Sequence, residues 1–113
     1  MDRKKGNNQI QTLIGKGTTF QGTIISSENM QIDGKQVGEI TTKGNLIITE
    51  SGEVRGKGQA ENLLLAGVLD GESKVNRTMK ILATGNFEGQ AEMAIFMVEE
   101  GAGFQGECRQ NKK

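Results

Sequence analysis

The stretch GNFEGQA, residues 85–91, places two glycines four positions apart, with an apolar residue between them. The same arrangement recurs along the chain in GKQVGEI (34–40), GEVRGKG (52–58) and GVLDGES (67–73), with looser versions in TTFQGTI (18–24) and GAGFQGE (101–107). The spacings between the second glycines are 16, 18, 15, 18 and 17 residues. Six copies at a regular period indicate a repeat architecture. These glycines are Gly22, Gly38, Gly56, Gly71, Gly89 and Gly106.

Each of the last five glycines is accompanied by an upstream pair of apolar residues separated by one position. Alternation of this kind keeps one face of a β-strand apolar, because successive side chains of a strand point to opposite faces. The pattern therefore predicts one short strand per repeat. The pairs are Met30/Ile32, Leu46/Ile48, Leu63/Leu65, Met79/Ile81 and Ile95/Met97.

A second apolar position lies two residues before the repeating glycine in five of the six copies. Gln36 interrupts this series, and the apolar residue of that copy, Val37, is shifted by one place. We therefore expect the second repeat to be distorted at this point. The apolar members of the series are Phe20, Val54, Leu69, Phe87 and Phe104.

The period and the short alternating segments together predict an all-β fold. We expect a right-handed parallel three-sided β-helix of about six rungs over residues 12–108, with rungs about 4.8 Å apart. Residues 1–11 and 109–113 are expected to form short disordered tails. The windows 59–66 and 90–98 are rich in helix-forming residues. The glycines around both windows and the regular period argue against a helix there.

The composition excludes several functions. The chain of 113 residues has 14 basic and 14 acidic side chains, and it lacks His, Trp and Tyr. This balance does not suit a nucleic-acid binder, and the commonest general base and metal ligand is missing. GAGFQG (101–106) fits G-x-G-x-x-G, but too few residues follow for the helix and second strand of a dinucleotide site. We expect no enzyme activity, metal, cofactor or nucleotide.

The single cysteine, Cys108, cannot form an internal disulfide, which fits a reducing cytoplasmic location. We expect its side chain to be a small apolar residue of the last rung rather than a redox site.

Four segments of the chain resemble characteristic segments of the bactofilins, which are bacterial cytoskeletal proteins. They are TLIGKGTTFQGTI (12–24), NMQIDGKQVGEI (29–40), TKGNLIITESGEVRG (42–56) and VEEGAGFQGEC (98–108). The resemblance implies a right-handed parallel β-helix core with short tails. It also implies end-to-end assembly into filaments without nucleotide, and a scaffolding role for cell-shape, cell-wall or motility machinery, whose proteins would be clients.

The end rungs of a solenoid leave an unpaired strand and an open apolar core, which favour association with another copy. We expect the chain to bind itself through these ends. A second hypothesis is a monomeric or dimeric binding module for a protein partner. The residues expected at the polymer interface are Phe104, Phe96 and Met97 at one end and Phe20, Leu13 and Ile14 at the other.

The first residues of the chain are basic, and we expect them to contact a membrane surface weakly. Each basic residue near anionic lipid contributes about 1 kcal/mol, and a filament presents many copies at once. A solvated tail is the alternative. The expected location is the cytoplasm, including the inner face of the cell membrane. The residues concerned are Met1, Arg3, Lys4 and Lys5.

Overall fold

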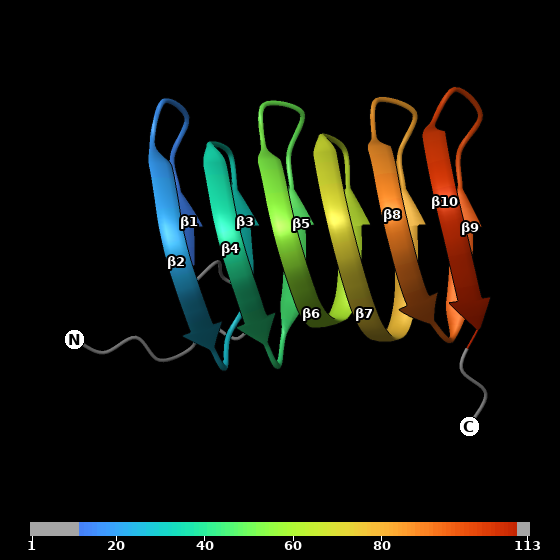
Figure 1. Ribbon diagram of the computed structural model, residues 1–113, viewed down its shortest axis with the longest axis horizontal. Coiled ribbons are helices and arrows are strands. Elements are labelled where there is room, and N and C mark those ends of the chain that lie inside the picture. Colours follow the sequence, from blue (N-terminus) through green and yellow to red (C-terminus); the bar gives the residue numbers. More distant parts are fainter. Residues whose placement is uncertain (1–11, 111–113) are drawn as a thin grey trace.

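The computed structural model describes residues 12–110, which form ten β-strands and no helix. The chain winds as a right-handed solenoid, with the longer strand segments in front and the shorter ones behind in Figure 1. This confirms the predicted all-β, right-handed parallel β-helix; the three-sided cross-section stays a prediction. The strands are β1 (Thr12–Ile14), β2 (Thr19–Ser26), β3 (Met30–Ile32), β4 (Lys35–Thr42), β5 (Asn45–Ile48), β6 (Glu53–Leu65), β7 (Val68–Ile81), β8 (Asn86–Met93), β9 (Ile95–Val98) and β10 (Gly103–Gln110).

Each turn of the solenoid, called a rung below, pairs in parallel with the turns before and after it. The long segments pair in the order β2, β4, β6, β7, β8, β10. The short segments pair in the order β1, β3, β5, β6, β7, β9. Strand β10 continues two residues past the expected boundary at residue 108, because Arg109 and Gln110 pair with Glu92 and Met93.

The core is a stack of inward columns, each built from one residue per rung. In one column Ile32, Ile48, Leu65 and Ile81 are in register, and all four are completely buried. Burial of an aliphatic side chain of this size contributes about 1.5–3 kcal/mol. The inner rungs are therefore held together by like side chains stacked on one another.

The expected distortion at Gln36 is wrong. Gln36 is completely buried and stays in register between Phe20 and Val54. Its Nε2 donates a hydrogen bond to the Gly22 carbonyl, 3.1 Å away in the preceding rung. This bond pairs the amide nitrogen of the inward Gln36, whose Oε1 has no hydrogen-bond partner among the described residues. Val37 lies outside, in register with Arg55.

The assignment of the last apolar pair is also wrong. Phe96 is in register with the buried Met79, and Val98 is in register with the buried Ile81. The inward pair of β9 is therefore Phe96/Val98, whereas Ile95 and Met97 are in register with the outward residues Thr78 and Lys80. All four residues of β9 are apolar, so the sequence is compatible with either alternate pair pointing inward.

The repeating glycines form a continuous ladder along the long segments, in register from rung to rung. Gly56 has φ of 130°, and its partners in the neighbouring rungs, Gly38 and Gly71, have φ of 128° and 135°. A Cβ on Gly56 would overlap the carbonyl oxygen of Gly38. Both the backbone conformation and the close approach of the rungs therefore require glycine.

Substitution of two nearby glycines should have opposite effects. Gly58 lies on the same strand without a positive φ, and an added Cβ would make only an ordinary contact of 3.8 Å with Leu46. Gly58→Ala should therefore stabilise the fold by about 0.4–1 kcal/mol. Gly56→Ala should destabilise it by about 1–3 kcal/mol or more. The urea midpoint of unfolding of each variant measures the difference. Equal midpoints for the two variants would contradict the requirement for glycine at position 56.

A polar network closes one corner between the second and third rungs. The Thr49 Oγ1 donates a hydrogen bond of 2.6 Å to the Asp33 Oδ1, and the Gln31 Nε2 donates one of 3.0 Å to the same oxygen. The Ser51 Oγ donates to the Asp33 carbonyl at 2.7 Å. The bond from Thr49, followed by that from Gln31, holds the pKa of Asp33 below its ordinary value.

This lowered pKa predicts an acid-sensitive contribution to stability. The contribution is present above the ordinary Asp pKa of about 3.9, and it is lost as the pH falls through the lower folded-state pKa. Wild type should therefore lose more stability than Asp33→Asn between about pH 5 and pH 3. Urea midpoints at both pH values provide the measurement. Equal losses in the two proteins would show that the network does not bind the charged carboxylate.

Candidate functional site: the two ends of the solenoid

The strands at both ends of the solenoid have a neighbour on one side only. Among the described strands, β1 and β2 pair only with β3 and β4, and β9 and β10 pair only with β7 and β8. Each terminal strand therefore presents a row of backbone N–H and C=O groups that no other strand of residues 12–110 pairs with. Such an edge is a template for pairing with another chain.

The C-terminal end presents an aromatic cluster. The Phe104 ring stacks on the Phe87 ring with centroids 5.2 Å apart and planes 9° apart. The Phe96 ring meets the Phe104 ring edge-on, with centroids 5.4 Å apart. Phe87 is 2% exposed because Phe104 covers it, whereas Phe104 itself remains partly exposed. Within the described part of the chain, the stack therefore ends on the Phe104 ring.

The inward columns become exposed where the rungs stop. Ile81 is completely buried, but Val98, the next residue of the same column, is 47% exposed. Phe96, the next residue after the buried Met79, is likewise only partly buried. The C-terminal end therefore exposes the same kind of apolar surface that each inner rung buries against its neighbour.

The N-terminal end face also contains apolar side chains. Phe20 is 38% exposed, Ile14 is 7% exposed, and Ile24 is partly buried against the core. The Phe20 ring lies over Gly22, with Cε1 3.5 Å from the position that a Cβ on Gly22 would take. In the inner rungs that side of the glycine faces the carbonyl of the preceding rung. The Phe20 ring thus covers part of the open end.

The expected interface residues divide into two groups. Phe104 and Phe96 lie in the C-terminal end face, and Phe20 and Ile14 lie in the N-terminal one. Leu13 and Met97 instead align with the outward side chains of Gln31 and Lys80. The sequence analysis did not predict two further residues of the end faces, Val98 and Ile24. Val98 could have been identified, because every other residue of its column is aliphatic.

Met1, Arg3, Lys4 and Lys5 lie outside the described residues. Cys108 is exposed on β10 in register with Ala91, and its Sγ is 3.4 Å from the Met93 Sδ.

The glycines of GAGFQG belong to the solenoid itself. Gly103 begins β10, and Gly106, with φ of 134°, extends the glycine ladder beside Gly89. A phosphate-binding loop would have to open a helix, and the described part of the chain contains none. The motif therefore forms the last rung.

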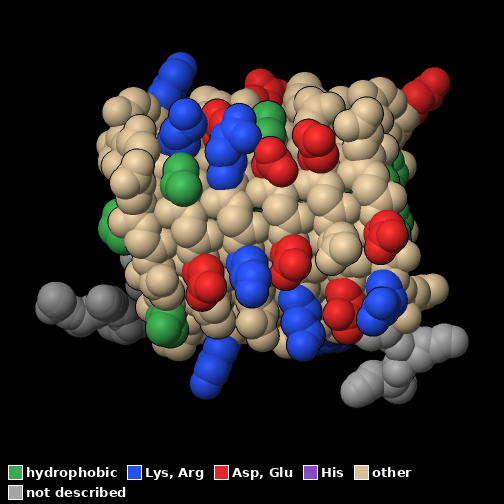
Figure 2. All heavy atoms as spheres, in the orientation of Figure 1, with side chains coloured by type: hydrophobic (Ala, Val, Ile, Leu, Met, Phe, Trp, Pro, Cys, Tyr) green, Lys and Arg blue, Asp and Glu red, His purple; other side chains and the backbone are tan. Residues whose placement is uncertain are grey.

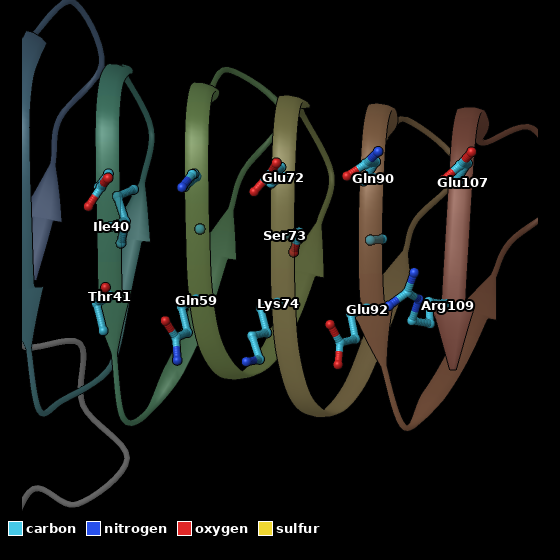
Figure 3. Close-up of a pocket in the computed structure, with 14 residues that line it drawn as sticks. Ile40, Thr41, Gln59, Glu72, Ser73, Lys74, Gln90, Glu92, Glu107 and Arg109 are labelled. Atoms are coloured by element: carbon cyan, nitrogen blue, oxygen red, sulfur yellow. The ribbon is translucent and has the colours of Figure 1, made fainter. Parts of the chain in front are cut away.

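A shallow groove of about 370 Å³ crosses the long segments between two rows of outward side chains (Figure 3). Glu72, Gln90 and Glu107 lie along one row, and Lys74, Glu92 and Arg109 lie along the other. Charges alternate in sign along the second row, in which the three residues are successive cross-strand neighbours. Such pairs stabilise a sheet modestly, and the mixed charges do not select a ligand of one sign.

Residues 12–110 contain no group of three or more Cys, Asp or Glu side chains placed to hold a metal ion. They also contain no helix that is long and apolar enough to cross a membrane.

A protein-family comparison matches residues 12–109 to the bactofilin family model, described as polymer-forming cytoskeletal. The match spans almost the whole solenoid. The chain belongs to the bactofilin family. It is accordingly related to structural, polymer-forming proteins of the bacterial cytoskeleton rather than to a family of enzymes.

Two curated bactofilins of Myxococcus xanthus (strain DK1622) are similar to this chain. Bactofilin BacP is 24% identical over 100 residues, which are 88% of this chain and 42% of BacP. Bactofilin BacO is 24% identical over 102 residues, which are 90% of this chain and 81% of BacO. The chain therefore spans less than half the length of BacP. No solved structure gives a significant match.

Proposed function

We propose that this bactofilin is a cytoskeletal scaffold whose copies associate end to end into filaments. The polymer-forming character of the family supports self-association. The observation that carries the end-to-end geometry is the pair of unpaired edges around open apolar columns. Contact between two ends would bury Phe96, Phe104 and Val98 and would satisfy the edge hydrogen bonds together.

The distribution of charge supports the ends rather than the long-strand face as the point of contact. In Figure 2 the long-strand face carries rows of acidic and basic side chains. Several form ion pairs within the molecule, as Arg55 does with Glu53 at 2.6 Å and with Asp70 at 3.1 Å. Charged residues are depleted from the centres of protein interfaces, and the end columns consist of apolar residues.

We further propose that assembly needs no nucleotide, because the glycine motif forms a rung and the interactions at the ends are apolar contacts and backbone hydrogen bonds. The filament would organise cell-shape, cell-wall or motility machinery in the cytoplasm, through client proteins that bind its sides. Weak contact of Met1, Arg3, Lys4 and Lys5 with the inner face of the cell membrane remains part of this proposal.

Phe104→Arg should abolish or shorten the filaments, because it places a charge in the apolar contact. The fold should survive, since Phe104 is only partly buried in the last rung and the rungs beneath it are unchanged. Negative-stain microscopy measures filament length, and far-UV circular dichroism measures retention of β-structure.

The matched control is Gln105→Arg, which adds the same charge to the same rung. Gln105 is exposed on the side of the solenoid, in register with Glu88, so the new arginine would lie beside a carboxylate. Filaments should form normally in this variant. Filaments of unchanged length in Phe104→Arg would contradict the end-to-end contact. A wild-type mass that stays constant with concentration would favour the monomeric or dimeric binding module instead.

A further inference from the structure

One column of outward side chains on the short segments, here called the outer column, contains most of their large apolar outward residues. Its members are in register through β1, β3, β5, β6, β7 and β9, and from the second rung on each lies between two inward residues of its strand. Ile47 and Leu64, at the centre of the column, are partly exposed although they are large and apolar. From the first rung to the sixth, the column consists of Leu13, Gln31, Ile47, Leu64, Lys80 and Met97.

The outer column has a symmetric pattern of polarity. Apolar residues occupy the first, third, fourth and sixth rungs, and polar residues occupy the second and fifth. The midpoint of the pattern lies between Ile47 and Leu64. A pattern that matches itself when reversed suits a contact between two identical surfaces related by a two-fold axis.

We propose that the outer column is a lateral contact between two copies of this chain, packed face to face with their solenoid axes antiparallel. Each rung then faces the partner rung equally far from the other end. Ile47 faces the partner's Leu64, Leu13 faces the partner's Met97, and Gln31 faces the partner's Lys80. This contact is separate from the proposed end-to-end contact and would join copies or filaments side by side.

The charges favour the antiparallel orientation over the parallel one. A parallel two-fold contact would place Lys80 opposite the same lysine of its partner, which is repulsive. The antiparallel contact places Lys80 opposite Gln31, whose amide is bonded to the Asp33 carboxylate at 3.0 Å. The only ion pair of Lys80 within the described residues is with Glu99, at 3.9 Å between half-exposed side chains, and such a pair is weak. Lys80 is thus available to a carboxylate of the partner.

The residues around the outer column also favour contact with a protein over contact with a lipid surface. Its neighbouring columns include Asn29, Asn45 and Asn62, which are joined by hydrogen bonds of 2.9 Å from Asn45 N to Asn29 Oδ1 and from Asn62 Nδ2 to Asn45 Oδ1. An apolar centre with a satisfied polar rim is the usual anatomy of a protein interface. An anionic membrane would instead attract a cluster of cations, and the outer column has only Lys80.

The test uses Leu64→Glu, with Val37→Glu as its matched control. Both residues are apolar, outward and partly exposed, and each lies beside a cation in the next rung, Lys80 or Arg55. Both variants are made in the Phe104→Arg background, which removes the proposed end-to-end contact. Analytical ultracentrifugation then measures the mass in solution, and circular dichroism confirms the fold.

The Phe104→Arg protein should have twice the mass of one chain. Adding Val37→Glu should leave this mass unchanged, whereas adding Leu64→Glu should reduce it to the mass of one chain. A single-chain mass for all three proteins would overturn the lateral contact, as would a doubled mass that survives Leu64→Glu. If Phe104→Arg still forms filaments, the end-to-end proposal fails. The lateral contact is then judged by whether Leu64→Glu, but not Val37→Glu, halves the filament width.

Cross-linking tests the orientation without changing an apolar residue of the column. Gln31→Cys and Lys80→Cys are prepared separately in a Cys108→Ala background and then mixed under oxidising conditions. The antiparallel contact predicts a disulfide-linked heterodimer in the mixture and no dimer in Gln31→Cys alone. A dimer of Gln31→Cys with itself, or no cross-link in the mixture, would overturn the antiparallel arrangement.

Discussion

The close approach of glycine backbones in successive rungs is the constraint on which the rest of this solenoid depends. At Gly56 a side chain would meet the carbonyl oxygen of Gly38, and the φ of 130° is one that L-residues rarely adopt. The same glycine position recurs in every rung, so the long segments remain in register from β2 to β10. This register in turn stacks like residues in the inward columns, which supply the apolar burial that stabilises the fold.

The rungs of residues 12–110 are equivalent, and none of them has a feature that would prevent a further rung from stacking on the last one. The interactions that hold Phe87 beneath Phe104 would equally hold another rung above Phe104, because the column and the strand edge continue to the surface. Stability within the molecule and association between molecules therefore draw on the same apolar contacts and backbone hydrogen bonds. The sides differ from the ends. Opposite charges alternate along the long-strand face, as in Glu39, Lys57 and Glu72, and they keep most of that face solvated.

Much of this architecture could be predicted from the sequence, because the glycine period and the alternating apolar pairs are both local patterns. The apolar position before each repeating glycine also placed Phe104 and Phe20 in the last and first rungs. The phase of β9 could not be predicted, since Ile95 to Val98 are all apolar and the one-residue corner at Ala94 decides which pair points inward. The burial of Gln36 depends on the Gly22 carbonyl in the preceding rung, a partner that no local pattern reveals. The outer column likewise becomes visible only when the register of six rungs is known.

In the proposed filament, the strands of one molecule continue the stack of the next, so that strands run across the filament and rungs repeat along it. Electron diffraction or averaged power spectra of aligned filaments test this arrangement. A strong meridional reflection at about 4.8 Å, parallel to the filament axis, is the predicted result. Filaments in which this reflection lies on the equator would have their rungs stacked across the axis, and that result would contradict end-to-end assembly.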